Sequence, residues 1–484
     1  MTSAGLRRDA LGALAVGFPG GTAPDPLRRA VADGLGCVVL FTRNVHDPGQ
    51  LAALTASLRA ERPDLLIAID HEGGEFSHLS AVSRWPMPSP RTLGDLDDLA
   101  LTRTCAREAA ETLARFGIDV MLAPSVDVNS NPANPIISTR SFGTTPDLVA
   151  RHGGAFIAGV HEAGIAACAK HFPGHGDVAV DSHLDLPYVD RWAEEVATVE
   201  LPPFVAAIEA GVDLVMSAHI VFSDYDTVPA TLSRRVLTGL LREELGFTGV
   251  ITTDALEMRG ITSRRSIPDA VVASVAAGAD LAMVAVAEAD PDGLAAALVD
   301  AVGNDRLEPG RLADAAERVR GLGAALAAHR LGPEGEESGE GVLEVTRRVV
   351  DGQAIPQIGP APYVVDLAQP VHPAWRPYFD GLPEVFGLDG VVIRTDESGA
   401  IDTAAANAAG RSLVIGVQDA VRTPWMATAL RHLLGKHSGP MVVLCTGIPE
   451  DRALVPPEVP VIGAGGRNLV VLKAIAARLT GADA

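Results

Sequence analysis

Residues 165–176 read IAACAKHFPGHG, a short apolar run that leads directly into a polar, glycine-rich loop. The run ends at Lys170 and does not alternate between apolar and polar side chains. Continuous runs of this length are typical of strands that are buried on both faces of a parallel sheet. The stretch therefore predicts one strand of such a sheet, with a polar loop at its carboxyl end.

Runs of the same kind recur before residue 285, with helix-like, alanine-rich segments between them. Eight are found, at Ala13–Phe18, Gly36–Phe41, Leu65–Asp70, Ile118–Ala123, Ile165–Lys170, Asp213–Ala218, Gly249–Asp254 and Ala279–Val284. Eight strand–helix units predict a (β/α)8 TIM-like barrel. A doubly wound open sheet is the alternative, because it also places its ligands at the carboxyl ends of strands.

A second, smaller domain is expected because 484 residues exceed what one hydrophobic core usually supports. Residues 331–341 read LGPEGEESGEG, a charged, glycine-rich linker. Five further runs follow it, at Tyr363–Leu367, Gly390–Arg394, Leu413–Val417, Met441–Cys445 and Val459–Ile462. The sequence predicts a catalytic barrel at 1–335 and an α/β sandwich domain at 342–484. The glycine-rich segment Gly463–Arg467 favours a tight turn over a nucleotide site.

Composition and charge argue against several partners. A formal net charge of −22 disfavours nucleic acid, because phosphate binding requires clustered lysine and arginine. The four cysteines are far apart, which indicates reduced core thiols and a reducing cytoplasm. No segment approaches the ~20 apolar residues of a membrane span, and the N-terminus lacks a signal-peptide pattern. We therefore expect a cytoplasmic protein with no membrane partner.

Chemistry is concentrated between Lys170 and His183, where three histidines, two aspartates and one lysine fall within fourteen residues. A metal site is disfavoured because His171 and His175 are separated by Phe-Pro-Gly and cannot stack on a helix, and no cysteine or glutamate nearby completes a ligand set. A structural turn with incidental histidines is a second alternative. Acid–base chemistry is favoured, because Asp181 stands two residues before His183 and can orient its imidazole. We expect no metal and no cofactor.

Two aspartates end apolar runs of the predicted barrel. On spacing alone, Asp254 is equally well placed to cap the next helix, with Glu257 closing a capping box, or to act as a catalytic carboxylate. Its position at the same barrel face as Lys170 favours catalysis. Asp70 precedes a glycine pair, so its alternatives are a structural turn and a carboxylate that grips sugar hydroxyls.

These residues are similar to a known pattern: the chain resembles family 3 glycoside hydrolases, and among them the β-N-acetylglucosaminidase branch. The resemblance rests on DHEGG at 70–74, RSFG at 140–143, KHFPGHGD at 170–177, DSH at 181–183 and TD at 253–254, in matching order and spacing. It covers most of the barrel. The region after residue 341 is similar only in its α/β pattern.

The resemblance implies a role for each matching residue. Asp254 is the nucleophile, His183 is the general acid and then the base, and Asp181 forms a dyad with His183. The residues implied to contact the terminal sugar are Asp70, Arg140, Lys170, His171 and Met216. An imidazole with a pKa of ~6.5 donates and accepts protons near neutral pH without the upward shift that a carboxylic acid requires.

The sequence departs from the family pattern at three positions. Glu75 and His78 stand where arginines are common, and His71 stands where glutamine or glutamate is usual. The departures at Glu75 and His78 bear on the contacts to the outer hydroxyls of the sugar and not on the mechanism. They keep β-glucosidase activity open as an alternative specificity.

The resemblance thus implies a retaining exo-glycoside hydrolase that removes terminal β-linked N-acetylglucosamine from cell-wall-derived or chitin-derived saccharides through a covalent glycosyl-enzyme. A phosphorylase is the rival reaction, because histidine in place of a carboxylate reduces the repulsion of phosphate. A catalytically dead sugar-binding module is disfavoured by the intact catalytic positions. The expected partner is a small saccharide, the expected assembly a monomer or homodimer, and the second domain is expected to be mainly structural.

Overall fold

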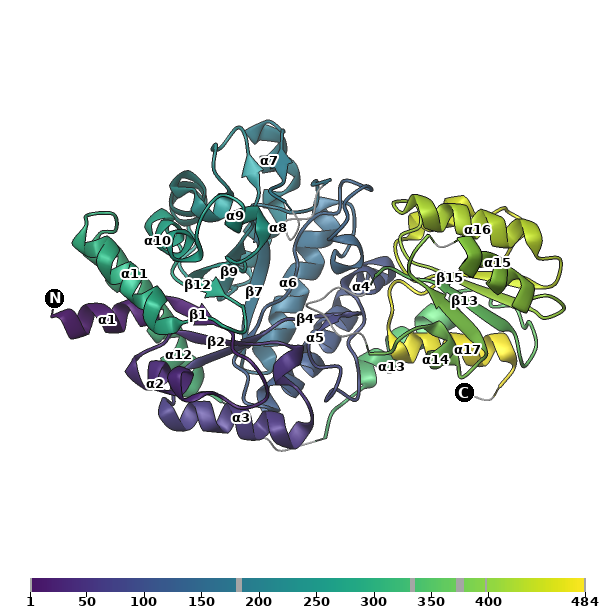
Figure 1. The fold of residues 1–484 in the computed structure, drawn as a ribbon, viewed down its shortest axis with the longest axis horizontal. Helices are drawn as coiled ribbons and strands as arrows, with labels where there is room; N and C mark the ends of the chain where they lie inside the picture. The colour runs from purple at the N-terminus through teal and green to yellow at the C-terminus, as the bar shows by residue number, and fades with distance from the viewer. Residues whose placement is uncertain (1, 180–184, 331–335, 371–377, 397, 483–484) are drawn as a thin grey trace.

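The computed structural model describes residues 2–179, 185–330, 336–370, 378–396 and 398–482. Two helix-covered sheets lie side by side in it, the larger one formed by the N-terminal part of the chain (Figure 1). Among the described residues, the polar ones singled out in the sequence lie in or after strands of the larger sheet.

The larger sheet has eight parallel strands that overlap the eight predicted runs. They are β1 (Leu14–Val16), β2 (Cys37–Leu40), β3 (Leu66–Ile69), β6 (Val120–Met121), β7 (Ala166–Phe172), β9 (Leu214–Ser217), β11 (Val250–Thr253) and β12 (Ala282–Val284). Their order is β11-β9-β7-β6-β3-β2-β1-β12. A bridge between Thr252 and Leu281 joins the two ends, and Thr253 N donates to Leu281 O at 3.0 Å. The predicted TIM-like barrel is confirmed, and the open sheet is excluded.

The strands alternate between two apolar environments, which is why their sequences show no polar face. One set of side chains fills the barrel interior and includes Ala68, Cys168 and Met216. The residues between them pack outward against the helices, as Ile67, Ile69 and the rest of the outer core do. Burial on both faces selects apolar residues at every position, as in other parallel sheets.

Helices surround this barrel (Figure 1). Their bounds are α1 (Ser3–Gly12), α2 (Asp25–Asp33), α3 (Pro48–Glu61), α4 (Pro90–Leu96), α5 (Leu99–Arg115), α6 (Pro146–Glu162), α7 (Ala193–Val199), α8 (Leu201–Glu209), η4 (Arg235–Glu244), α9 (Arg259–Thr262), α10 (Ile267–Ala277), α11 (Pro291–Gly303) and α12 (Pro309–Ala327). Several begin with a proline in the first turn after a polar cap. Asp47 is one such cap and accepts from Gln50 N at 2.9 Å, which satisfies a helix donor that has no partner within the helix.

Several short elements lie at the carboxyl face of the barrel. They are the antiparallel pair β4 (His71–Gly73) and β5 (Phe76–Ser77), the parallel pair β8 (Tyr188–Val189) and β10 (Val221–Phe222), and the turns η1 (Thr42–Asn44), η2 (Ser138–Arg140) and η3 (Ala230–Leu232). The β4–β5 hairpin follows β3 directly. It therefore carries the residues after Asp70 toward the second domain.

The second sheet has five parallel strands in the order β14-β13-β15-β16-β17. Its elements are α13 (Glu340–Asp351), β13 (Tyr363–Leu367), α14 (Leu382–Phe386), β14 (Gly390–Ile393), α15 (Ser398–Asn407), β15 (Leu413–Val417), α16 (Pro424–Lys436), β16 (Met441–Cys445), η5 (Pro449–Leu454), β17 (Val461–Gly463) and α17 (Leu469–Thr480). Helices cover both of its faces, which confirms the predicted α/β domain (Figure 1). The boundary between 335 and 342 stays a prediction.

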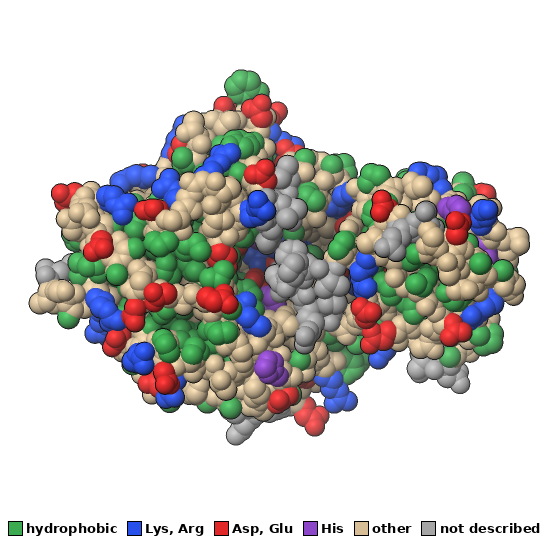
Figure 2. Space-filling model, viewed as in Figure 1, with side chains coloured by type: hydrophobic (Ala, Val, Ile, Leu, Met, Phe, Trp, Pro, Cys, Tyr) green, Lys and Arg blue, Asp and Glu red, His purple; other side chains and the backbone are tan. Residues whose placement is uncertain are grey.

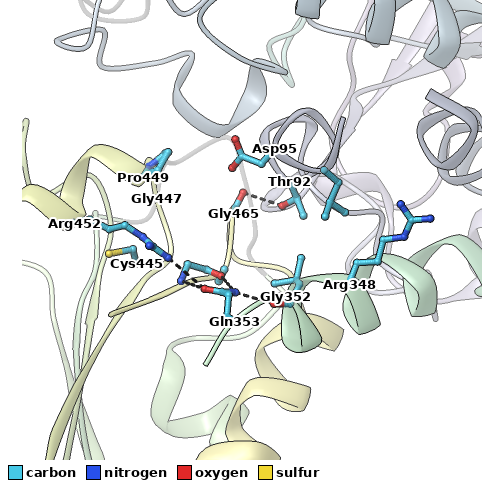
Figure 3. A pocket seen from close by; sticks show the side chains of 14 residues that line it. Thr92, Asp95, Arg348, Gly352, Gln353, Cys445, Gly447, Pro449, Arg452 and Gly465 are labelled. Carbon is cyan, nitrogen blue, oxygen red and sulfur yellow. Dashed lines mark hydrogen bonds between the residues drawn. The ribbon is translucent and has the colours of Figure 1, made fainter. Parts of the chain in front are cut away.

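Gly465, in the glycine-rich turn after β17, joins the two domains (Figure 3). The Gly465 carbonyl accepts from Ser89 Oγ at 2.5 Å and from Thr92 Oγ1 at 3.0 Å, both at the start of α4. Gly465 has φ +66°, and a Cβ there would stand 2.5 Å from Thr92 Oγ1. The glycine permits the close approach of the domains, which agrees with the turn expected from the sequence.

Acidic and basic side chains are interspersed over the face shown in Figure 2, and neither sign gathers into one large patch. The face is hollowed near its centre, beside the second domain. None of the helices in the described part of the chain is both long and apolar enough to cross a membrane.

Candidate active site

Strand register brings four of the expected site residues to the inside of the barrel at its carboxyl end. Met216 lies in the interior cluster, 3% exposed, and pairs in register with both Lys170 and Thr252. Asp254 lies two residues beyond Thr252, and Asp70 lies two residues beyond the interior residue Ala68. Since side chains alternate along a strand, all of these positions face inward.

Lys170 is the centre of a buried charge cluster. Its Nζ donates to Asp70 Oδ1 at 2.6 Å and lies 2.6 Å from Glu72 Oε1. The side chain of Lys170 is 2% exposed and that of Glu72 is fully buried, whereas Asp70 is 17% exposed. Asp70 is therefore the carboxylate of this cluster that reaches the surface.

Arg140 completes the cluster through a bidentate ion pair. Its Nε and Nη2 donate to the two carboxylate oxygens of Glu72 at 2.7 and 2.8 Å. Burial alone would raise the pKa of Glu72, but the charges of Arg140 and Lys170 outweigh it and hold the pKa below its usual range. Burial also raises the pKa of Asp70, and Lys170 opposes that shift. Glu72 is consequently ionised and fixes both cations in place.

His171 has a defined tautomer. Arg140 Nη2 can act only as a hydrogen-bond donor, so His171 Nε2 is the acceptor of their 3.2 Å hydrogen bond. His171 Nδ1 therefore carries the ring proton and donates to Asp127 Oδ2 at 2.7 Å. The imidazole is held between a cation and an anion, with its ring plane fixed by both.

Asp127 is a functional candidate that the sequence reasoning did not single out. It is fully buried and accepts from the backbone N–H of His175 at 2.6 Å, in addition to its bond with His171. Burial would raise the pKa of Asp127, but the neighbouring His171 outweighs it, and the pKa is lowered. Asp127 lies six residues beyond the end of β6, whereas Asp70 directly follows β3, so the end of the apolar run gave only a weak signal for Asp127.

Asp254 is half-buried and follows β11. Its backbone N–H donates to Ser217 O at 3.2 Å, and its Oδ1 accepts from Ala255 N at 2.7 Å. The capping-box alternative is wrong: α9 starts only at Arg259, and Glu257 Oε2 accepts instead from Ala285 N at 3.0 Å. Asp254 is therefore not a helix cap.

Asp181 and His183, the expected dyad, lie outside the described residues. The segment that leads to them is firmly held. Asn134 Nδ2 donates to His175 O at 2.7 Å, and Asp177 pairs with Arg191 at 2.6 Å. A Cβ on Gly176 would overlap the carbonyl oxygen of Val128, so only glycine permits this approach.

The three departures from the family pattern have different environments. His71 Nδ1 lies 2.6 Å from Ser77 Oγ, and burial, together with His78, lowers the pKa of His71 to about 4. His78 Nδ1 lies 2.8 Å from Thr42 Oγ1, and burial, with Lys170 second, lowers the pKa of His78 to about 3. Both histidines are neutral parts of the hairpin core. Glu75 instead points at the second domain, where Gln418 Nε2 donates to it at 2.6 Å.

Comparison with known proteins places this barrel in a family. The family described as Glycosyl hydrolase family 3 N terminal domain matches residues 25–322. A β-hexosaminidase of Thiobacillus denitrificans is 38% identical over 283 residues, which are 57% of this chain and 78% of that one. A β-hexosaminidase of Pseudomonas aeruginosa is 36% identical over 303 residues, 62% of this chain and 87% of that one.

A solved structure extends the similarity to the second domain. The family 3 β-N-acetylglucosaminidase of Paenibacillus sp. superimposes with a TM-score of 0.87 at 30% identity, covering 100% of this chain and 97% of that chain. The chain belongs to glycoside hydrolase family 3.

Proposed function

We propose that this protein is a retaining exo-β-N-acetylglucosaminidase. The observation that carries the proposal is the inward register of Asp70, Lys170, Met216 and Asp254 at the carboxyl end of a closed barrel. The relatives named β-hexosaminidase and the Paenibacillus β-N-acetylglucosaminidase support the sugar. If the anomeric carbon of a sugar lies over Asp254, the hydroxyls of that sugar contact the cluster around Lys170.

The proposed mechanism has two steps. The Asp254 carboxylate attacks the anomeric carbon and forms a covalent glycosyl-enzyme, while His183 protonates the leaving oxygen. His183, oriented by Asp181, then removes a proton from a water molecule as the water oxygen attacks the anomeric carbon, and the bond from that carbon to Asp254 breaks, which releases the sugar with retained configuration and restores the carboxylate. Asp254 remains the only proposed nucleophile.

The proposed sugar-binding residues differ in how they act. Asp70 remains partly open, so its carboxylate accepts from hydroxyls directly, and Met216 forms an apolar wall beside it. Lys170 is already paired with Asp70 and Glu72. Arg140 donates to Glu72 and His171, and His171 donates to Asp127. Their main contribution is therefore a rigid, preorganised surface against which the sugar hydroxyls dock.

The test is the release of nitrophenol from the β-N-acetylglucosaminide and from the β-glucoside, each with and without phosphate. We expect turnover of the acetamido sugar alone, with no effect of phosphate. Asp254→Ala should lower kcat at least about a thousandfold, since it removes the nucleophile. Asp290→Asn, an exposed carboxylate at the start of α11, is the control. Acceleration by phosphate with formation of sugar 1-phosphate would assign a phosphorylase, and glucoside cleavage alone a β-glucosidase.

We also propose a cytoplasmic enzyme, monomeric or homodimeric, that acts on small cell-wall-derived or chitin-derived saccharides. Its support is chemical: Cys37, Cys105, Cys168 and Cys445 are all buried and free. Burial raises their thiol pKa values, so they behave as apolar core groups. Cell fractionation tests the location, and light scattering tests the assembly.

A further inference from the structure

A cavity of about 320 Å³ lies between the two domains. The barrel side comes from the β4–β5 hairpin and the segment before Arg140, and the other side from the carboxyl ends of β13 and β15. The residues that matter for its chemistry are Glu75, Phe76, Ser138, Gln418, Asp419 and Arg422.

Arg422 is the unusual group in this cavity. Its side chain is only 8% exposed, yet none of its three guanidinium nitrogens has a hydrogen-bond partner within the described residues. The nearest carboxylate oxygen, Asp419 Oδ1, is 3.7 Å away and already accepts from Ile448 N at 3.0 Å. A buried guanidinium whose N–H groups make no hydrogen bond within the described residues is costly, so these donors are available to a ligand.

The other charges of the cavity are already engaged. Arg467 donates to Asp366 at 2.8 and 3.1 Å, and Arg394 donates to Asp380 at 3.1 Å. Glu75 accepts from Gln418, and burial raises the pKa of Glu75 to about 7 against the opposing charge of Arg467. A carboxyl that is partly protonated near neutral pH repels an incoming anion less than an ionised one.

The start of α16 adds to the positive potential. This 13-residue helix begins at Pro424, two residues after Arg422, and its cap residue Thr423 makes no side-chain capping bond. Thr423 and Arg422 both line the cavity. Unsatisfied N–H groups at a helix N-terminus favour a negative group nearby.

The cavity adjoins the proposed sugar site. Phe76, which lines it, has its ring centroid 5.1 Å from the Arg140 guanidinium carbon. Ser138 stands two residues before Arg140 and donates to Asp419 Oδ2 at 2.8 Å. The same two barrel segments thus supply the charge cluster at the mouth and one wall of the cavity.

We propose that this cavity is a second subsite, which binds a carboxylate or phosphate group carried by the saccharide substrate, with Arg422 as its specificity-determining residue. The inference rests on the proposed function, because it takes the barrel mouth to hold the terminal sugar. It gives the second domain a direct part in substrate choice. A planar guanidinium matches the paired oxygens of either group.

Three substrates test the proposal with the full chain. One is the neutral nitrophenyl β-N-acetylglucosaminide, the second carries a carboxylate on its leaving sugar, and the third carries a phosphate ester on the sugar removed. In Arg422→Gln, the ratio of KM for an acidic substrate to KM for the neutral one should rise about tenfold to a hundredfold. The substrate that responds identifies which end of the saccharide reaches the cavity.

The control is Arg431→Gln, which removes an exposed positive charge from the same helix and should leave the ratio unchanged. Thermal melting checks that Arg422→Gln is folded, and we expect no loss of stability because the guanidinium makes no hydrogen bond to any described residue. An unchanged KM ratio in Arg422→Gln for both acidic substrates overturns the proposal.

If the wild type cleaves none of the three, the proposed function fails, and the anion site is decided separately by calorimetric titration with inorganic phosphate. Binding to wild type and to Arg431→Gln, but not to Arg422→Gln, supports the site. Equal binding to all three proteins, or no binding to the wild type, overturns it.

Discussion

At the scale of single residues, the buried cluster around Glu72 decides whether the sugar site is preformed. Glu72 holds Arg140 and Lys170 at once, with no exposed surface of its own. Burying a carboxylate here costs desolvation energy. Its ion pairs and hydrogen bonds with the two cations offset that cost. The cluster is therefore a structural support as well as a part of the mouth.

Glu72→Gln should lower the free energy of unfolding by about 3–5 kcal/mol, because it leaves two buried cations with one carboxylate, Asp70. Urea denaturation measures the change. Glu344→Gln on α13, which removes a partly exposed partner of Arg347 and Arg348, is the control and should leave the midpoint nearly unchanged. A midpoint for Glu72→Gln equal to that of the control would show that the ion pairs of Glu72 do not contribute to stability.

At the scale of elements, the β4–β5 hairpin depends on two neutral histidines. The pKa values of His71 and His78 are lowered to about 4 and about 3, mainly by burial. In the unfolded chain these rings take up protons below pH ~6.5, so between pH 6.5 and 4 the unfolded state binds more protons. Stability is therefore complete above pH 6.5 and decreases as the pH falls.

His78→Gln should reduce the slope of the unfolding free energy against pH. The change corresponds to up to one proton, about 1.4 kcal/mol per pH unit between pH 6.5 and 4. Unfolding free energies measured across that range give the slope. His329→Gln, at an exposed position after α12, should keep the wild-type slope. Identical slopes for wild type and His78→Gln would contradict the buried, neutral state of His78.

The elements also show how far sequence reasoning extends. The strands were predictable because burial on both faces imposes continuous apolar runs, and the positions of Asp70, Lys170 and Asp254 followed from the ends of those runs. Local spacing failed for Glu257, whose partner Ala285 lies 28 residues away. It also gave no indication that Glu75 faces Gln418, since that contact joins segments 343 residues apart. Contacts made by tertiary packing leave no local pattern.

At the scale of the whole molecule, the two domains are joined where the Gly465 turn meets α4. Gly465→Ala should lower the melting temperature, because the Cβ adds a clash with Thr92 to the cost of a positive φ, roughly 1–3 kcal/mol in sum. Gly211→Ala is the matched control, since φ there is +79° with nothing within 4 Å. Equal losses in calorimetry for both variants would mean that the domain contact adds nothing.

In the proposed reaction, Asp254 forms a covalent bond with N-acetylglucosamine. The direct measurement is mass spectrometry of the protein after reaction with a slow-turnover 5-fluoro-N-acetylglucosaminyl fluoride, followed by peptide mapping. We expect one sugar per chain, attached to Asp254 and absent from Asp254→Ala. A sugar attached to a different carboxylate, or rapid release of the product with inverted configuration and no adduct, would contradict it.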